Sequence, residues 1–146
     1  MSHDTLIRSV VFAVALAALF VGHSLGDHIA QTDHQASLKA SSGAAAWRAL
    51  GGHLLTYHLT LTAVLLLTAA ALRLPLSPVG VVAGLAFSAL THGLLDRRWP
   101  VRAVLRLTRS PEFAETTSPV NGMYVADQAL HHLALLGTAL LIAAFS

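Results

Sequence analysis

Three histidine–aspartate pairs with one shared spacing are the residues of this sequence best suited to chemistry. The two members of each pair are four positions apart, so they lie on the same face of a helix. The pairs are His23 with Asp27, His92 with Asp96, and Asp127 with His131. Imidazole nitrogens and carboxylate oxygens together favour zinc, with iron or manganese as alternatives at higher coordination. The chain has no cysteine, which excludes thiolate ligands and a cysteine nucleophile.

Several other polar residues extend this set. His53 and Tyr57 have the same i, i+4 spacing, Gln31 lies one turn beyond the first pair, and Gln128 follows the aspartate of the third. His58 lies about 140° around the helix from His53, and the sequence leaves open which of the two faces the other histidines. We expect metal ligands from a set of six residues: His23, Asp27, His53, His92, Asp96 and His131. Around the ligands we expect Gln31, Gln128 and His58.

The burial of several aspartates in apolar segments favours a bound cation. An aspartate at the centre of a membrane helix costs about 2.5–3.5 kcal/mol on insertion scales, and less near the interface. Histidine–aspartate pairs can also hydrogen-bond each other and hold helices together without a metal. One pair alone leaves that alternative open, whereas repetition on three helices favours a metal or catalytic site.

The composition shows which elements must carry these residues. Of the 146 residues, 55% are hydrophobic and 11% are charged, against about 25% charged in soluble domains. Four stretches of about 20 residues, the length of a bilayer span, lack Lys, Arg, Asp and Glu. In lipid the backbone must bond within its own segment, so each stretch should be a helix. We predict an all-α, four-helix transmembrane bundle in one domain, residues 1–146, with spans at about 6–26, 48–72, 75–96 and 124–145.

The basic residues set the predicted orientation. Two of them, Arg8 and Arg73, lie on one side of the predicted membrane, and the first and third loops carry the rest: Lys39, Arg48, Arg97, Arg98, Arg102, Arg106 and Arg109. By the positive-inside rule these loops are cytoplasmic and both termini lie outside. All but one of the nine basic residues are arginine, which together with much Ala and Leu indicates a bacterial inner membrane. Although the spans alternate in direction, every pair then falls in one layer at the cytoplasmic side.

The third loop is predicted to contain a short amphipathic cytoplasmic helix, at about residues 100–110. Arg102, Arg106 and Arg109 share one face of it, which favours contact with anionic lipid head groups. The alternative is that these arginines only set the orientation of the protein in the membrane and bind no particular lipid. The small net charge of +2 and its concentration in one loop argue against a nucleic-acid partner.

At the same residues the sequence resembles a family of small bacterial multi-pass membrane proteins known as a domain of unknown function. The resemblance covers most of the chain and rests on short motifs: His23, Leu25-Gly26-Asp27, Gln31, His53, Tyr57, His92-Gly93-Leu94-Leu95-Asp96, Asp127-Gln128 and His131. The sequence departs from the pattern at His28, where an aromatic or aliphatic residue is more usual. There is a looser similarity to membrane-bound metal-dependent hydrolases, which rests on site chemistry.

The leading functional hypothesis is an intramembrane metal-dependent hydrolase acting on a lipid or lipid-linked substrate at the cytoplasmic leaflet. Metal-bound water would be the nucleophile, with Asp127 or Asp27 as general base and Tyr57 stabilising developing negative charge. One alternative is a metal-ion or proton-coupled transport component or a metal sensor. Another is a small helper subunit that binds a partner membrane protein. A homo-oligomer is left open.

Overall fold

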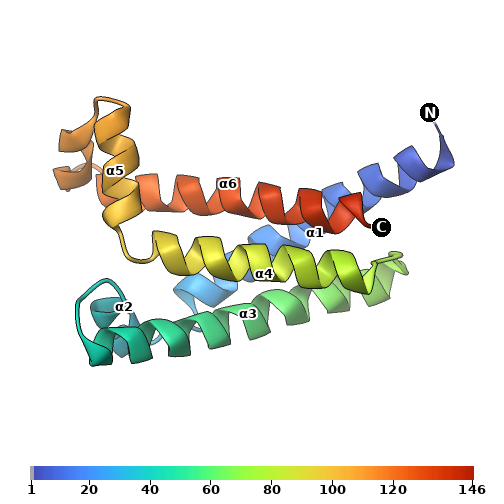
Figure 1. Cartoon of the computed structure of the whole chain (residues 1–146), viewed down its shortest axis with the longest axis horizontal. Coiled ribbons are helices and arrows are strands. Elements are labelled where there is room, and N and C mark those ends of the chain that lie inside the picture. The colour runs from blue at the N-terminus through green and yellow to red at the C-terminus, as the bar shows by residue number, and fades with distance from the viewer. Residues whose placement is uncertain (1) are drawn as a thin grey trace.

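The computed structural model describes residues 2–146, and this part of the chain contains helices and no strand. The elements in order are α1 (His3–His28), α2 (Asp33–Leu38), α3 (Ala44–Leu72), α4 (Pro78–Leu95), α5 (Trp99–Leu107), the 3₁₀ helix η1 (Pro111–Glu115) and α6 (Gly122–Ala144). The predicted all-α fold is therefore confirmed. Within residues 2–146, four helices are long and apolar enough to cross a membrane, namely α1, α3, α4 and α6. They run along the long axis of the molecule (Figure 1).

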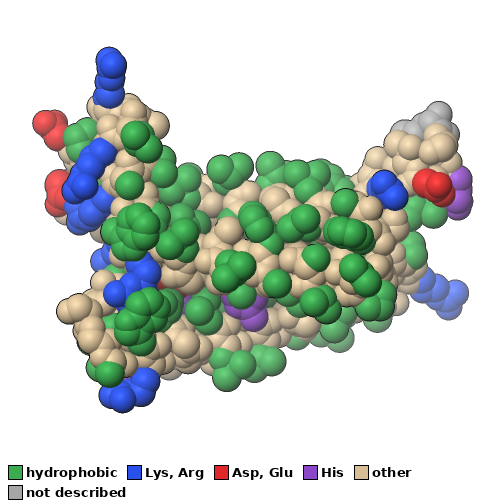
Figure 2. Space-filling model, viewed as in Figure 1, with side chains coloured by type: hydrophobic (Ala, Val, Ile, Leu, Met, Phe, Trp, Pro, Cys, Tyr) green, Lys and Arg blue, Asp and Glu red, His purple; other side chains and the backbone are tan. Residues whose placement is uncertain are grey.

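The apolar core fills the half of the bundle nearer the chain termini. There α1 packs against α3 and α6, and α4 packs against α6. Leu19, Leu61, Leu65 and Leu135 are among the buried side chains that close this half. Hydrophobic side chains also cover the outer face of the bundle (Figure 2), which is the pattern expected where lipid is the solvent.

Small residues let α1 approach α3 closely at the other end of the core. A Cβ atom at Gly22 would lie 3.0 Å from the Cα atom of Leu61, and one at Gly26 would lie 2.8 Å from the ring of Tyr57. Glycines four positions apart are a common contact motif between membrane helices. This contact seats Tyr57 directly against α1.

Both termini lie at one end of the bundle, and α2, α5 and η1 lie at the other (Figure 1). Most Lys and Arg side chains visible in Figure 2 gather at the end that carries α5. The helix expected in the third loop is present as α5, but it ends at Leu107. Arg109 follows it with a φ of 60°, so the prediction that Arg109 shares a helical face with Arg102 and Arg106 is wrong. The structure leaves the cytoplasmic orientation as a prediction.

Two short elements and one boundary differ from the expected pattern. The first loop contains α2, which begins with a capping box between Thr32 and Gln35. The third loop also contains η1. Helix α4 begins at Pro78 rather than near residue 75, because the hydroxyl of Ser77 accepts a hydrogen bond from the Gly80 backbone N–H and caps the helix there.

Replacing Gly80 with alanine should destabilise the bundle. Its Cβ would lie 2.7 Å from the Ile142 carbonyl oxygen on α6, and overpacking of this kind costs about 1–3 kcal/mol. Gly51→Ala is the matched control, because a Cβ at Gly51 meets nothing within 4 Å. Thermal unfolding in detergent, followed by circular dichroism, should show a lower midpoint for Gly80→Ala alone. Equal midpoints would contradict this close contact between α4 and α6.

Candidate metal centre

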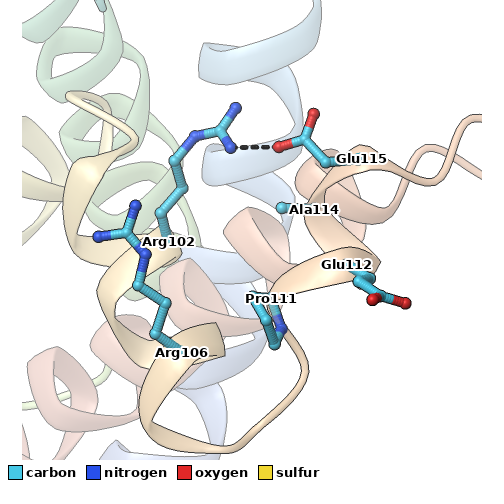
Figure 3. Close-up of a pocket in the computed structure, with 6 residues that line it drawn as sticks. All are labelled: Arg102, Arg106, Pro111, Glu112, Ala114 and Glu115. Atoms are coloured by element: carbon cyan, nitrogen blue, oxygen red, sulfur yellow. Dashed lines mark hydrogen bonds and ion pairs between the residues drawn. The ribbon is translucent and has the colours of Figure 1, made fainter.

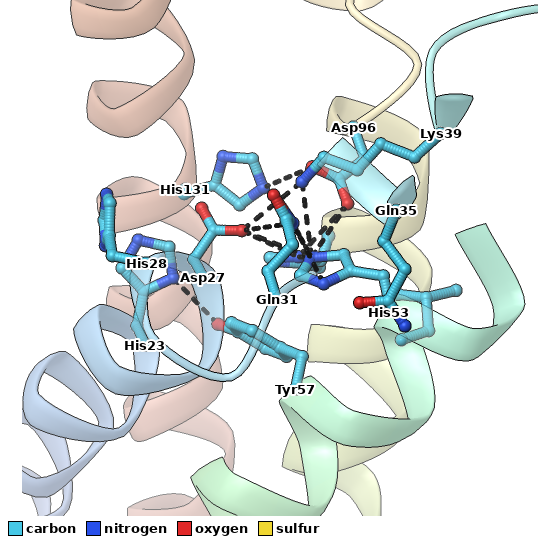
Figure 4. A network of polar contacts seen from close by, with 12 residues as sticks. His23, Asp27, His28, Gln31, Gln35, Lys39, His53, Tyr57, Asp96 and His131 are labelled. Atoms are coloured by element: carbon cyan, nitrogen blue, oxygen red, sulfur yellow. Dashed lines mark hydrogen bonds and ion pairs between the residues drawn. The ribbon is translucent and has the colours of Figure 1, made fainter. Parts of the chain in front are cut away.

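Four buried or nearly buried side chains meet at the end of the bundle near α2. They come from α1, α3 and the end of α4, and they are Asp27, His53, His92 and Asp96. Each offers one ligand atom, and these four atoms lie within 4.8 Å of one another. The group, called here the four-donor cluster, could hold a metal ion. Figure 4 shows its surroundings.

The spacing of the donors matches what a tetrahedral ion needs. The Nε2 atoms of His53 and His92 are 3.0 Å apart, and Oδ2 of Asp96 is 3.3 Å from each. Oδ1 of Asp27 is 3.2 Å from Nε2 of His53 and 3.9 Å from that of His92. Zinc bonds of about 2.0–2.2 Å in a tetrahedron place the donors about 3.3 Å apart. The distances among His53, His92 and Asp96 therefore fit a zinc site, and Asp27 is the loosest member of the four-donor cluster.

A hydrogen-bonded chain holds Asp27 in place. The Gln128 amide nitrogen donates to Oδ2 of Asp27 at 3.1 Å, so the Gln128 oxygen is left to accept from Nε2 of His23 at 2.9 Å. Nδ1 of His23 then accepts from the Tyr57 hydroxyl at 3.0 Å. Both nitrogens of His23 are thus engaged, and in this structure His23 orients Asp27. A direct bond from His23 to a metal stays a prediction.

The structure places His53, and not His58, in the four-donor cluster. Gln31 lies past the end of α1, and its amide nitrogen is 3.0 Å from Nδ1 of His53 and 3.5 Å from Oδ1 of Asp27. His58 points between α3 and α4, where Nδ1–H donates to its own helix backbone and Nε2 lies 3.2 Å from the hydroxyl of Ser88. Helix rotation thus separates the two histidines.

The third pair lies beside the four-donor cluster. Nδ1–H of His131 donates to the Asp127 carbonyl at 2.9 Å and lies 3.5 Å from the Asp127 carboxylate. Nε2 of His131 is 3.9 Å from Oδ1 of Asp96, which is too long for a hydrogen bond. The imidazole is buried and packs edge-on against His92. Its role as a metal ligand also stays a prediction.

Lys39 lies at the four-donor cluster and was not among the site residues predicted from the sequence. It caps α2, it is buried, and its ammonium lies 2.7 Å from Oδ1 of Asp96, 3.4 Å from Oδ1 of Asp27 and 3.3 Å from Nε2 of His53. The Arg97 guanidinium donates to the Lys39 carbonyl at 2.7 Å and stacks over the Trp47 ring, which fixes the backbone here. The available signal was that Lys39 is the one lysine among nine basic residues.

Lys39 compensates part of the negative charge. Burial alone would raise the pKa of Asp96, which lies just past α4, but the imidazoles of His53 and His92 and the Lys39 ammonium hold it below its usual range. Asp96 is therefore anionic at neutral pH. Two carboxylates, those of Asp27 and Asp96, face the one ammonium of Lys39, and a bound cation or a protonated imidazole of the cluster would balance the remaining negative charge.

Several buried polar atoms at this level also have no hydrogen-bond partner among residues 2–146. They are Nδ1 of His92, Oδ2 of Asp96, Oδ1 of Asp127 and Nε2 of His131. A buried polar atom without a partner is costly. Two of these atoms, on Asp96 and His131, lie at or beside the four-donor cluster, so Lys39 does not complete the site.

A polar cavity of about 310 Å³ adjoins the four-donor cluster. Asp27, Asp96, Gln31 and Lys39 line it on the side of the cluster, and Arg98 lines it farther out. A second cavity, of about 270 Å³, lies between α5 and η1 (Figure 3). Arg102 and Arg106 line that one, and Arg102 pairs with Glu115. Contact of these arginines with lipid head groups stays a prediction.

Comparison with known proteins shows the family of the chain. A family model described as "Protein of unknown function (DUF3307)" matches residues 15–145, so the chain belongs to that family. No curated protein and no solved structure matches it. The chemistry must therefore be argued from the site itself.

Asp96→Asn should abolish stoichiometric zinc binding, because an amide is a poor substitute for an anionic ligand that also pairs with Lys39. Asp33→Asn is the matched control, since Asp33 is exposed and lines the same polar cavity. Elemental analysis of the purified protein in detergent measures the zinc content. Equal zinc in both variants, or none in the wild type, would contradict a metal at the four-donor cluster.

Lys39→Met should make the protein depend on metal for stability. Removing one partner of a buried ion pair costs about 3–5 kcal/mol, so the zinc-free variant should unfold at a lower temperature than wild type. Zinc should then raise the unfolding temperature more in the variant than in wild type, because the ion supplies the missing charge. A smaller rise in the variant would mean that Lys39 helps to hold the metal instead.

Proposed function

We propose that this member of the DUF3307 family is an intramembrane metal-dependent hydrolase acting on a lipid or lipid-linked substrate at the cytoplasmic leaflet. The observation that carries the proposal is the close spacing of the four-donor cluster, made of imidazoles and carboxylates beside a polar cavity. Zinc sites of histidine and carboxylate ligands are typical of catalysis, whereas structural zinc sites are rich in cysteine.

The donor distances suggest which residues would hold the metal and which would act on the substrate. His53, His92 and Asp96 form the tight part of the cluster, at 3.0–3.3 Å from one another. Three protein ligands and one open position define a catalytic zinc site. His53, His92 and Asp96 would hold the metal, and the position beside Asp27, the loosest donor, would be left for water or substrate. A metal there would polarise the substrate and lower the pKa of bound water to about 7.

The residues around that position have separate roles. Asp27, held by Gln128, is placed to accept a proton from water as general base. Asp127 lies on the cavity wall beside His131 and is the weaker candidate for that role. The Tyr57 hydroxyl donates to His23 and its ring stacks on His92 at 3.8 Å. We therefore assign Tyr57 to positioning these histidines in place of the charge stabilisation expected from the sequence.

A lipid substrate is supported by the level at which the site lies. The four-donor cluster sits where the apolar helices end, close to α5. That helix exposes Trp99 and Leu107 next to Arg102 and Arg106, which is the pattern of a helix lying in the membrane interface. A lipid head group at this level is within reach of the polar cavity.

Asp27→Asn should lose turnover by about a hundredfold or more while keeping zinc, because it removes the general base while His53, His92 and Asp96 still hold the metal. Zinc-loaded protein in detergent is incubated with bacterial lipid extract, and mass spectrometry follows release of head groups or acyl chains. Asp33→Asn is the control for activity. Stoichiometric zinc without any turnover by wild type would reject the hydrolase and favour a metal sensor or transport component.

A further inference from the structure

Two cationic side chains line the polar cavity together with the carboxylates of the four-donor cluster. They are Lys39, which is buried, and Arg98, which is exposed. We propose that the substrate carries a phosphate ester, and that Lys39 and Arg98 bind its phosphate beside the metal. This inference rests on the proposed function and names the substrate class for it.

The backbone turns Arg98 toward the cavity. Arg98 follows Asp96 by two residues and has a φ of 62°, in the left-handed region that non-glycine residues rarely adopt. Its side chain lines the polar cavity and also an adjoining cavity of about 410 Å³. Across residues 2–146 it makes no side-chain hydrogen bond or ion pair, whereas the neighbouring Arg97 is bound to the Lys39 carbonyl. Arg98 is therefore available to a ligand.

The acidic groups around the cavity already have cationic or imidazole neighbours. Asp96 and Asp27 contact Lys39, and Asp127 lies 3.5 Å from Nδ1 of His131. Asp33 lies on α2 and is exposed. An anion in the polar cavity thus meets two cationic side chains, those of Arg98 and Lys39, beside the four-donor cluster.

A phosphate fits this combination better than a neutral ester or amide does. The arginine fork matches two phosphate oxygens, and clamps of Arg, Lys and a metal ion stabilise phosphoryl groups during transfer. A carboxylic ester needs only one polarising group at its carbonyl. Because it is neutral, it carries no charge that Lys39 and Arg98 could neutralise. In the reaction, water adds to phosphorus as the bond from phosphorus to the lipid alcohol breaks. One proton of the water passes through Asp27 to the leaving oxygen.

The test compares ligands that share the phosphate and differ in the rest. Zinc-loaded protein is titrated by calorimetry with dihexanoyl phosphatidate, inorganic phosphate and dihexanoylglycerol. We expect phosphatidate to bind and dihexanoylglycerol to bind at least about tenfold more weakly, as loss of a charged hydrogen bond implies. If inorganic phosphate also binds, the phosphate alone suffices; if it does not, the site takes a lipid head group. Either result supports the inference.

Arg98→Gln should weaken phosphatidate binding about tenfold. Arg73→Gln is the matched control, because Arg73 also follows a long helix, is exposed and has a positive φ of 51° at the opposite end of the bundle. Equal binding by the two variants would overturn the inference. So would equal affinity for phosphatidate and dihexanoylglycerol.

A second measurement separates this inference from the proposed function. Zinc-loaded protein is offered a nitrophenyl phosphate diester and nitrophenyl butyrate, which release the same chromophore. Cleavage of the butyrate alone would support the proposed hydrolase function and would overturn the inference that the substrate is a phosphate ester. A protein that binds no zinc would overturn the proposed function, and the inference with it.

Discussion

The ion pair between Lys39 and Asp96 is the interaction on which the polar end of the bundle depends. Asp96 is 1% exposed and lies 2.7 Å from the Lys39 ammonium. An anionic carboxylate buried this deeply needs positive charge within a few ångströms, and α2 must fold back over α3 to bring it. The capping box of α2 and the hydrogen bonds from Arg97 to the backbone carbonyls of residues 39 and 41 hold Lys39 in this position. The first loop is thus ordered by electrostatics.

Tyr57 both packs between the helices and positions the histidines of the site. Its ring lies against Gly26 of α1 on one side and stacks on His92 of α4 on the other, and its hydroxyl fixes His23. A larger residue at position 26 would push the ring into the histidines. The glycine contact that brings α1 and α3 together is therefore also what sets the angle of His92 and, through His23 and Gln128, the position of Asp27.

The sequence was sufficient for the fold and for the layer, because both depend on local patterns. Apolar length predicts the spans, and i, i+4 spacing puts His92 and Asp96 on one face. Lys39 could not be predicted, since its position depends on the path of a loop in three dimensions. The choice between His53 and His58 depends on the rotation of α3 about its axis. Because α3 is apolar on most of its faces, its sequence does not show which face points into the bundle. Arg109 left the helical face because α5 ends one turn earlier than its charge pattern suggests.

The polar layer lies at one end only, and this asymmetry bears on mechanism. From Leu19, Leu61 and Leu65 toward the termini the interior is mainly apolar, and Thr138 adds a buried hydroxyl there. An ion crossing the bilayer through a single copy would meet no charged or imidazole side chain among the buried residues there, and such a path is costly in hydrocarbon. Whatever reaches the four-donor cluster must therefore enter and leave from the same face. The four-donor cluster and the polar cavity thus lie together on one side of the apolar core. Transport through one copy would need a polar path across this core, where Leu19, Leu61 and Leu65 are fully or almost fully buried and Thr138 offers one hydroxyl.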